Sequence, residues 1–258
     1  MTEDDKIPFT SHLEELRRRL VIAFIAIAIG FVASYGFKEY LFEILVRPLK
    51  LVMAEGDTLI FTNLPEAFFT YLKVAFLTGI GLASPVILYQ FWMFVAPGLY
   101  DKEKRLLLPI VFLSTLFFVG GALFGYFIVF PYGFEFFLGF ATETIRPMPS
   151  MKEYLAFAAK LLLAFGIVFE LPLVITFMAK LGLVTVPFLK RNRKYAILLF
   201  FAGSAILTPP DVVTQVMMAL PLMLLYEISI FGARIFGRKP LETGDADDPE
   251  AGESAQAE

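Results

Sequence analysis

Residues 11–37 read SHLEELRRRLVIAFIAIAIGFVASYGF. Three consecutive arginines, Arg17–Arg19, stand directly before an apolar run that extends from Leu20 to about Phe37. This run is longer than the apolar core of about 7–15 residues in a cleaved signal peptide. The bulky segment Tyr35–Tyr40 offers no clear small-x-small cleavage site after it. We therefore interpret the run as a retained first membrane span, with the arginines as its anchor or as part of a working surface.

The composition of the whole chain is that of an integral membrane protein. Of its 258 residues, 58% are apolar and 18% are charged, which is far from the balance in a soluble domain. Gly, Ala and Ser recur in the apolar stretches as they do in packed membrane helices. We predict an all-α integral membrane protein with six transmembrane helices. The six stretches are Leu20–Phe37, Ala67–Val95, Leu106–Gly133, Tyr154–Ala179, Tyr195–Leu207 and Val212–Phe236.

The fifth stretch is short for a membrane span. Tyr195–Leu207 has 13 residues, which gives about 20 Å of helix against a hydrocarbon core of about 30 Å. A short hairpin here would thin the bilayer locally or be shielded by neighbouring protein. Alternatively, the helix extends back through Arg191–Lys194, and those side chains reach the interface. The residues themselves leave both interpretations open.

The distribution of Lys and Arg over the connecting segments predicts the orientation. Fifteen lie on the side of the N-terminus and five on the opposite side, so the positive-inside rule places both termini in the cytoplasm. We divide the chain into an N-terminal cytoplasmic segment (1–19), a transmembrane domain (20–236) and a tail (237–258). From Leu241 to Glu258 the tail holds seven acids and no Lys or Arg, which predicts a disordered, solvent-exposed segment.

The residue inventory argues against an enzyme and against a metal or cofactor site. The chain has no cysteine and one histidine, which excludes disulfides, thiolate metal sites and histidine-rich metal clusters. It also contains no GxxxxGK[ST] loop, no HExxH pair and no GxSG motif, so nucleotide hydrolysis and proteolysis find no support. We expect no cofactor and no nucleic-acid partner; the lipid bilayer is the expected surrounding.

The segment between the first two spans contains a predicted amphipathic helix. Over Glu39–Val46, the residues Leu41, Ile44 and Leu45 fall on one face. Proline lacks an amide donor and clashes with the preceding turn. We therefore expect Pro48 to end this helix.

Glu170, in AFGIVFELPLVI, lies deep in the fourth stretch. An ionisable side chain in a membrane is costly and marks a functional candidate. Pro172 follows it and frees a backbone carbonyl one turn earlier. A role at a binding or translocation surface and a structural hydrogen bond between helices are both open.

A second polar group lies in LTPPDVVTQV, at the hairpin between the last two stretches. Asp211 opens the sixth stretch and is expected to cap its helix. Gln215 lies one turn further on the same face. Together with Thr208 on the preceding helix, it offers interhelical polar contacts, each worth about 1 kcal/mol.

The acids at the cytoplasmic side have different expected roles. Ser11 and Glu14 have the spacing of a capping box, so we expect Ser11 to cap the first helix. Glu15 and Arg19 are four residues apart, a spacing at which an ion pair gives local helix support. Beyond that support, Glu15 has no obligatory structural task. Glu103 lies among three basic residues in the loop after the second span, where a solvated loop acid is the simpler interpretation.

Five segments in order resemble the TatC family, the core membrane subunit of the twin-arginine protein translocase. They are HLEELRRRL, ASPVILYQFWMFVAPGLYDKEKR, FGYFIVFPYGFEFF, AFGIVFELP and TPPDVVTQVMMALPLMLLYEISI. The resemblance extends from about Phe9 to Phe236, and five ordered motifs on six spans make it highly specific. Asp101 departs slightly from the family pattern, in which a neutral or basic residue also occurs at this position.

The resemblance implies a glove-like, concave bundle of six spans with short fifth and sixth helices and both termini cytoplasmic, in a bacterial plasma (inner) membrane. It implies a receptor for twin-arginine signal peptides that exports folded proteins, driven by the proton-motive force, with no enzymatic activity of its own. The implied partners are TatA- and TatB-type single-span proteins and other TatC copies.

The resemblance also assigns roles to residues. Glu15 and Glu103 contact the signal arginines. The further signal-binding positions are Arg17, Pro48 and Phe94. The polar positions that face the cavity or dock a partner helix are Glu170, Thr208, Asp211 and Gln215.

Two other functions compete with this one. Glu170 would serve a secondary transporter as a proton-coupled carboxylate, or the spans would form a scaffold that only gathers partners. No internal repeat is apparent between 1–130 and 131–258, which weighs against an inverted-repeat transporter.

Overall fold

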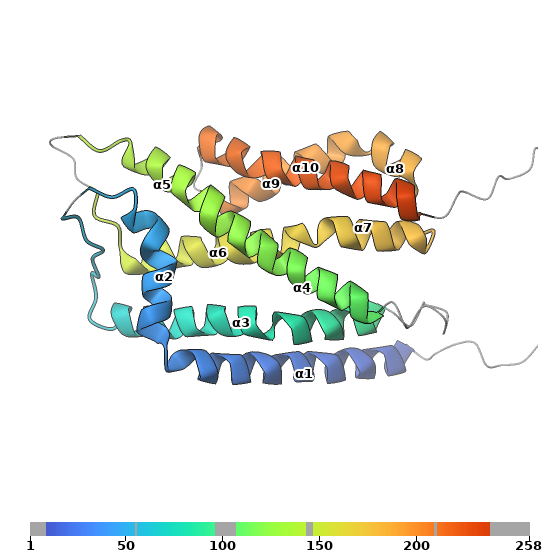
Figure 1. Cartoon of the computed structure of the whole chain (residues 1–258), viewed down its shortest axis with the longest axis horizontal. Helices are drawn as coiled ribbons and strands as arrows, with labels where there is room; N and C mark the ends of the chain where they lie inside the picture. The colour runs from blue at the N-terminus through green and yellow to red at the C-terminus, as the bar shows by residue number, and fades with distance from the viewer. Residues whose placement is uncertain (1–8, 55, 96–106, 143–146, 209–210, 238–258) are drawn as a thin grey trace, which may run out of the picture.

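The computed structural model describes residues 9–54, 56–95, 107–142, 147–208 and 211–237. In these ranges the chain is almost entirely helical, as predicted, and most of its helices run along one axis (Figure 1). The elements are α1 (Phe9–Tyr35), α2 (Lys38–Lys50), α3 (Glu66–Val95), α4 (Leu107–Phe124), the π-helical turn η3 (Gly125–Val129), α5 (Phe130–Leu138), α6 (Met151–Phe169), α7 (Leu171–Lys180), α8 (Val186–Arg191), α9 (Arg193–Leu207) and α10 (Val212–Phe236).

Several helices are long and apolar enough to cross a membrane. Among the described residues there are four such spans, Glu66–Val95, Leu107–Leu138, Met151–Lys180 and Val212–Phe236, or five if α1 and α2 together count as one. The predicted second, third, fourth and sixth stretches match these spans closely. The count of six spans stays a prediction, because α9 falls below the length of a full span.

The structure distinguishes the two interpretations of the fifth stretch. Helix α9 has 15 residues, about 22 Å at helical rise. It begins at Arg193, and Asn192 separates it from α8. The helix therefore extends back over Arg193 and Lys194 but not to Arg191, and it stays shorter than a full span. The expectation of a short sixth helix is also wrong, because α10 has 25 residues and continues through Pro221.

Helix α2 turns away from the bundle axis. It meets α1 at 90° and lies across the end of the bundle opposite the start of α1 (Figure 1). The prediction that Pro48 ends this helix is wrong, because α2 continues to Lys50. Pro48 cannot donate to the carbonyl of Ile44 four residues earlier. The Tyr126 hydroxyl donates to that carbonyl at 2.5 Å instead.

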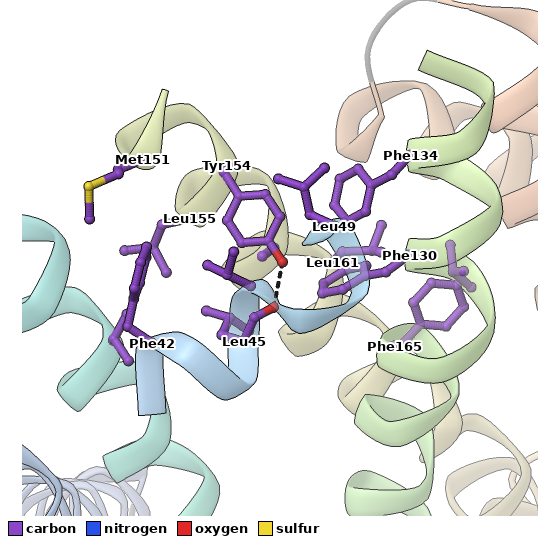
Figure 2. Packing of buried hydrophobic residues seen from close by; sticks show 14 of the residues in the cluster. Phe42, Leu45, Leu49, Phe130, Phe134, Met151, Tyr154, Leu155, Leu161 and Phe165 are labelled. Atoms are coloured by element: carbon purple, nitrogen blue, oxygen red, sulfur yellow. Dashed lines mark hydrogen bonds between the residues drawn. The ribbon is translucent and has the colours of Figure 1, made fainter. Parts of the chain in front are cut away.

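A large core cluster packs α2 against α5 and α6. Figure 2 shows Tyr154 of α6 pointing at the backbone of α2, where its hydroxyl donates to the Leu45 carbonyl at 2.5 Å. Phe130, Leu161 and Phe165 are at most 1% exposed in the same cluster. Beside it, an apolar hollow of about 380 Å³ lies between α2, α3, α4 and α6, which gives this part of the bundle a concave face.

Glycines allow α1 and α3 to approach closely. A Cβ atom added to Gly79 would lie 2.6 Å from the backbone nitrogen of Phe31, and one added to Gly30 would lie 2.6 Å from the Gly79 carbonyl oxygen. Small residues at such crossings bring membrane helices into backbone contact. This contact fixes α1 against α3 and so places the first turns of α1 beside the end of α3.

Candidate functional site

We call the end of the bundle where α1 begins and α3 ends the N-terminal end (Figure 1). Its central feature is a pair of side chains on α1. Arg19 Nε donates to Glu15 Oε1 at 3.0 Å, and Arg19 Nη2 donates to the same oxygen. Arg19 Nη1 also donates to Gln90 Oε1 on α3 at 3.4 Å. The i,i+4 pair expected from the sequence therefore forms, and Arg19 has a second, unpredicted partner on α3.

A hollow of about 490 Å³ surrounds this pair. Its lining comes from α1 and α3 and combines acids, arginines, an amide and apolar side chains: Glu14, Glu15, Arg18, Arg19, Ile22, Tyr89, Gln90 and Met93. The side chains of Arg19 and Glu15 are 18% and 32% exposed. Solvent-borne groups therefore reach the carboxylate, while the apolar walls lower the local polarity and strengthen charge-assisted hydrogen bonds.

Phe94 lies close to this hollow, on the same helix as Gln90. Its ring stacks on His12 of α1, with centroids 4.5 Å apart and planes 23° from parallel. Arg17 is exposed on α1. The structure thus brings Glu15, Arg17 and Phe94 to one end of the bundle. Glu103 lies outside the described residues.

Two expectations for this region change. Helix α1 already includes Phe9 and Thr10, so Ser11 lies inside the helix and is not its N-cap. An N-cap residue precedes the first helical turn, and its side chain accepts hydrogen bonds from the free amides of that turn. A residue with helical backbone on both sides does not have this position. Pro48 lies in α2, at the opposite end of the bundle from Glu15 (Figure 1). It does not share a site with that carboxylate.

Glu170 lies at the junction between α6 and α7 and is 9% exposed. Ser114 Oγ of α4 donates to Glu170 Oε2 at 2.5 Å, and Trp92 Nε1 of α3 donates to Ser114 Oγ at 2.9 Å. Among the described residues, Glu170 Oε1 has no hydrogen-bond partner. The structural hydrogen bond considered from the sequence is therefore present, and the second oxygen is buried without a donor.

The hairpin between α9 and α10 has its polar groups engaged within the chain. Asp211 caps α10 as predicted, accepting from the Thr214 amide at 2.7 Å. Gln215 Nε2 donates across to the Phe201 carbonyl of α9 at 3.0 Å, which is the predicted kind of interhelical contact. Thr208 Oγ1 donates to the Ser204 carbonyl at 2.9 Å. These groups lie at the end of the bundle opposite Glu15.

Glu66 is a buried acid that the sequence interpretation missed. It is 6% exposed. Its Oε2 accepts from the Thr62 amide, the Thr62 hydroxyl and the Asn63 amide at 2.8–3.4 Å. Its Oε1 accepts from the Ser150 hydroxyl at 2.7 Å and the Lys152 amide at 3.1 Å. Glu66 thereby joins the segment before α3 to the start of α6. Its place directly before an apolar stretch gave no sign of these distant partners.

In the described part of the chain, no group of three His, Cys, Asp or Glu side chains comes together as metal ligands would. Polar groups lie instead at helix contacts and in charged hollows, one at the N-terminal end of the bundle and one lined by Lys38, Glu39 and Glu43. The fold and the site therefore define a polytopic helical membrane protein whose accessible chemistry is recognition of charged groups.

The family follows from comparison with known proteins. The model of the family "Sec-independent protein translocase protein (TatC)" matches residues 11–221. A TatC protein of Desulforapulum autotrophicum is 66% identical, and the alignment covers 99% of this chain and 93% of the relative. A TatC protein of Magnetococcus marinus is 49% identical, and the alignment covers 98% of this chain and 91% of the relative. A crystal structure of a "Twin Arginine Translocase Receptor- TatC" aligns with a TM-score of 0.80 at 45% identity, over 88% of this chain and all of that one. The chain belongs to the TatC family.

Proposed function

We propose that this chain is the receptor and core component of a Sec-independent translocase, which binds twin-arginine signal peptides and exports folded proteins. The observation that carries the proposal is the Glu15 carboxylate. In the structure it already holds a guanidinium, that of Arg19, beside Gln90 in an accessible hollow. A site that accommodates one guanidinium has the chemistry to bind a guanidinium from a signal peptide.

Two adjacent arginines need two acceptors. In this proposal Glu15 takes one arginine and Glu103 the other, because Glu103 follows the end of α3 by eight residues in the sequence. A single exposed ion pair contributes about 0–1 kcal/mol. Paired contacts and apolar contacts for the rest of the signal are needed for useful affinity. Arg17 and Phe94 lie at the same end of the bundle, outside the lining of the hollow.

The remaining residues would serve partners. We propose that TatA- and TatB-type single-span proteins dock a helix on the polar positions Glu170, Thr208, Asp211 and Gln215. Glu170 Oε1 supports this, since it is buried without a donor among the described residues, and a shift of the surrounding helices that admits a partner's donor would satisfy it. Pro48 would act indirectly, through the position of α2. The protein would lie in a bacterial plasma membrane with six spans and both termini in the cytoplasm, and the proton-motive force would drive export.

A complementation experiment tests the proposal. In cells that lack the gene, precursors with paired arginines should stay in the cytoplasm while the uptake of small solutes remains normal. The wild-type chain should restore export, and a chain with both Glu15→Ala and Glu103→Ala should not. Export of these precursors without the gene would refute the proposal. A selective loss of solute uptake would favour a transporter. Full export by the double variant would favour a scaffold.

A further inference from the structure

Arg19 holds one oxygen of the carboxylate to which the proposed function assigns a signal arginine, and a bidentate guanidinium needs both oxygens. Two nitrogens of Arg19, Nε and Nη2, donate hydrogen bonds to the same oxygen, Glu15 Oε1. Its third nitrogen reaches across to Gln90 of α3. An arginine that only supported α1 would need no partner on a second helix. Arg19 instead lies in the hollow between α1 and α3, more buried than the neighbouring, exposed Arg17 and Arg18.

We propose that Arg19 is an internal competitor of the signal peptide, which must leave Glu15 before a signal arginine binds there. This inference rests on the proposed function of Glu15. Arg19 thereby sets the affinity that a cationic segment needs in order to bind at Glu15. Basic segments that bind weakly do not displace it, and a signal with a paired arginine does.

The geometry provides for this exchange. Glu15 is 32% exposed, so an incoming group approaches the carboxylate from solvent. When Arg19 leaves Oε1, its contact with Gln90 Oε1 gives the displaced guanidinium an acceptor within the same hollow. The exchange therefore leaves the displaced guanidinium with an acceptor, in a hollow that Glu14 also lines, which lowers the cost of separating Arg19 from Glu15.

Competition has a defined thermodynamic consequence. A site that is competent only when Arg19 is absent binds every cationic ligand more weakly by the same factor. Removal of Arg19 should therefore raise the affinity for an Arg-Arg peptide and for its Lys-Lys counterpart equally. For an ion pair with this exposure we expect a gain of about fivefold. The preference for arginine over lysine should not change, because it comes from the fork geometry at Glu15.

The test is a binding titration on the full chain, purified in detergent. The probes are two fluorescent peptides that differ only in an Arg-Arg or a Lys-Lys pair ahead of an apolar run. Arg19→Gln is compared with Arg18→Gln, which removes the same charge from the same hollow but leaves the Glu15 pair intact. Arg19→Lys keeps the charge and loses the fork. The double variant Glu15→Gln plus Arg19→Gln removes both members of the pair.

We expect Arg19→Gln to tighten both peptides equally and by more than Arg18→Gln does, with Arg19→Lys in between. The gain should vanish when Glu15→Gln is also present. Arg19→Gln that weakens binding, or that only equals Arg18→Gln, overturns the inference while leaving the function of Glu15 in place. If Glu15→Gln alone binds the Arg-Arg peptide as the wild type does, the proposed function of Glu15 fails, and the inference fails with it. Circular dichroism confirms that each variant is folded.

Discussion

The contact between Tyr126 and α2 allows a sharp test of how this fold tolerates Pro48. Pro48 has no amide hydrogen, so the Ile44 carbonyl loses its helical donor, and the Tyr126 hydroxyl supplies one at 2.5 Å. Tyr126→Phe removes this donor and leaves the ring in place. A buried carbonyl without a partner costs about 1–3 kcal/mol. Because Tyr126 is half-buried and Ile44 is 42% exposed, we expect a loss at the lower end of this range, about 1 kcal/mol in the free energy of unfolding.

A second substitution tells this mechanism apart from a general loss of packing. Pro48→Ala restores an amide at position 48, four residues after Ile44. In the Tyr126→Phe background this amide should take over the vacant carbonyl. We therefore expect Pro48→Ala to be more favourable there than in the wild type by about 1 kcal/mol, as a coupling energy in a double-mutant cycle.

The assay is thermal unfolding of the detergent-purified protein, followed by circular dichroism. For a chain of this size, 1 kcal/mol corresponds to a shift of about 2–4 °C in the midpoint. Tyr132→Phe is the matched control, since Tyr132 is 58% exposed on the neighbouring α5 and should show no coupling to Pro48. Effects of Tyr126→Phe and Pro48→Ala that simply add would refute the reasoning.

Three further predictions use the same measurement or an export assay. Gly79→Ala should lower the unfolding free energy by about 1–3 kcal/mol through the backbone contact with α1, whereas Gly81→Ala, with open space around it, should not; equal effects would contradict the close crossing. Glu66→Gln should lower the unfolding midpoint more than Ser150→Ala does, because an amide cannot accept from both sets of donors; a midpoint equal to that of the wild type would refute this. A chain truncated after Lys239 should export at the wild-type level, and loss of export would show that the tail is required.

The sequence predicted the features that depend on local pattern. The apolar stretches became the long helices, and Asp211 became an N-cap because a short acid before a helix serves the first free amides. Glu170 was found because a charge in an apolar run is costly wherever the helices go. The pair of Glu15 and Arg19 followed from helix spacing.

The features that were missed depend on residues far apart in the chain. Pro48 remains inside a helix because a tyrosine 78 positions later donates to the freed carbonyl. Glu66 is held by Ser150 and Lys152, which no local pattern connects to it. Gln90 as a partner of Arg19 required the close approach of α1 and α3. Each of these contacts is set by tertiary packing, which local propensity does not encode.

The central claim is that the carboxylates of Glu15 and Glu103 bind the paired arginines of a signal peptide. Its most direct test is site-specific crosslinking of an Arg-Arg signal peptide to the purified chain, with Glu43→Gln, an exposed acid on α2 at the opposite end, as the control for lost charge. The account predicts that Glu15→Gln and Glu103→Gln each lower the crosslink yield without unfolding the protein. It predicts that the double variant loses the crosslink, while Glu43→Gln retains it. A double variant that crosslinks as efficiently as the wild type would contradict the account.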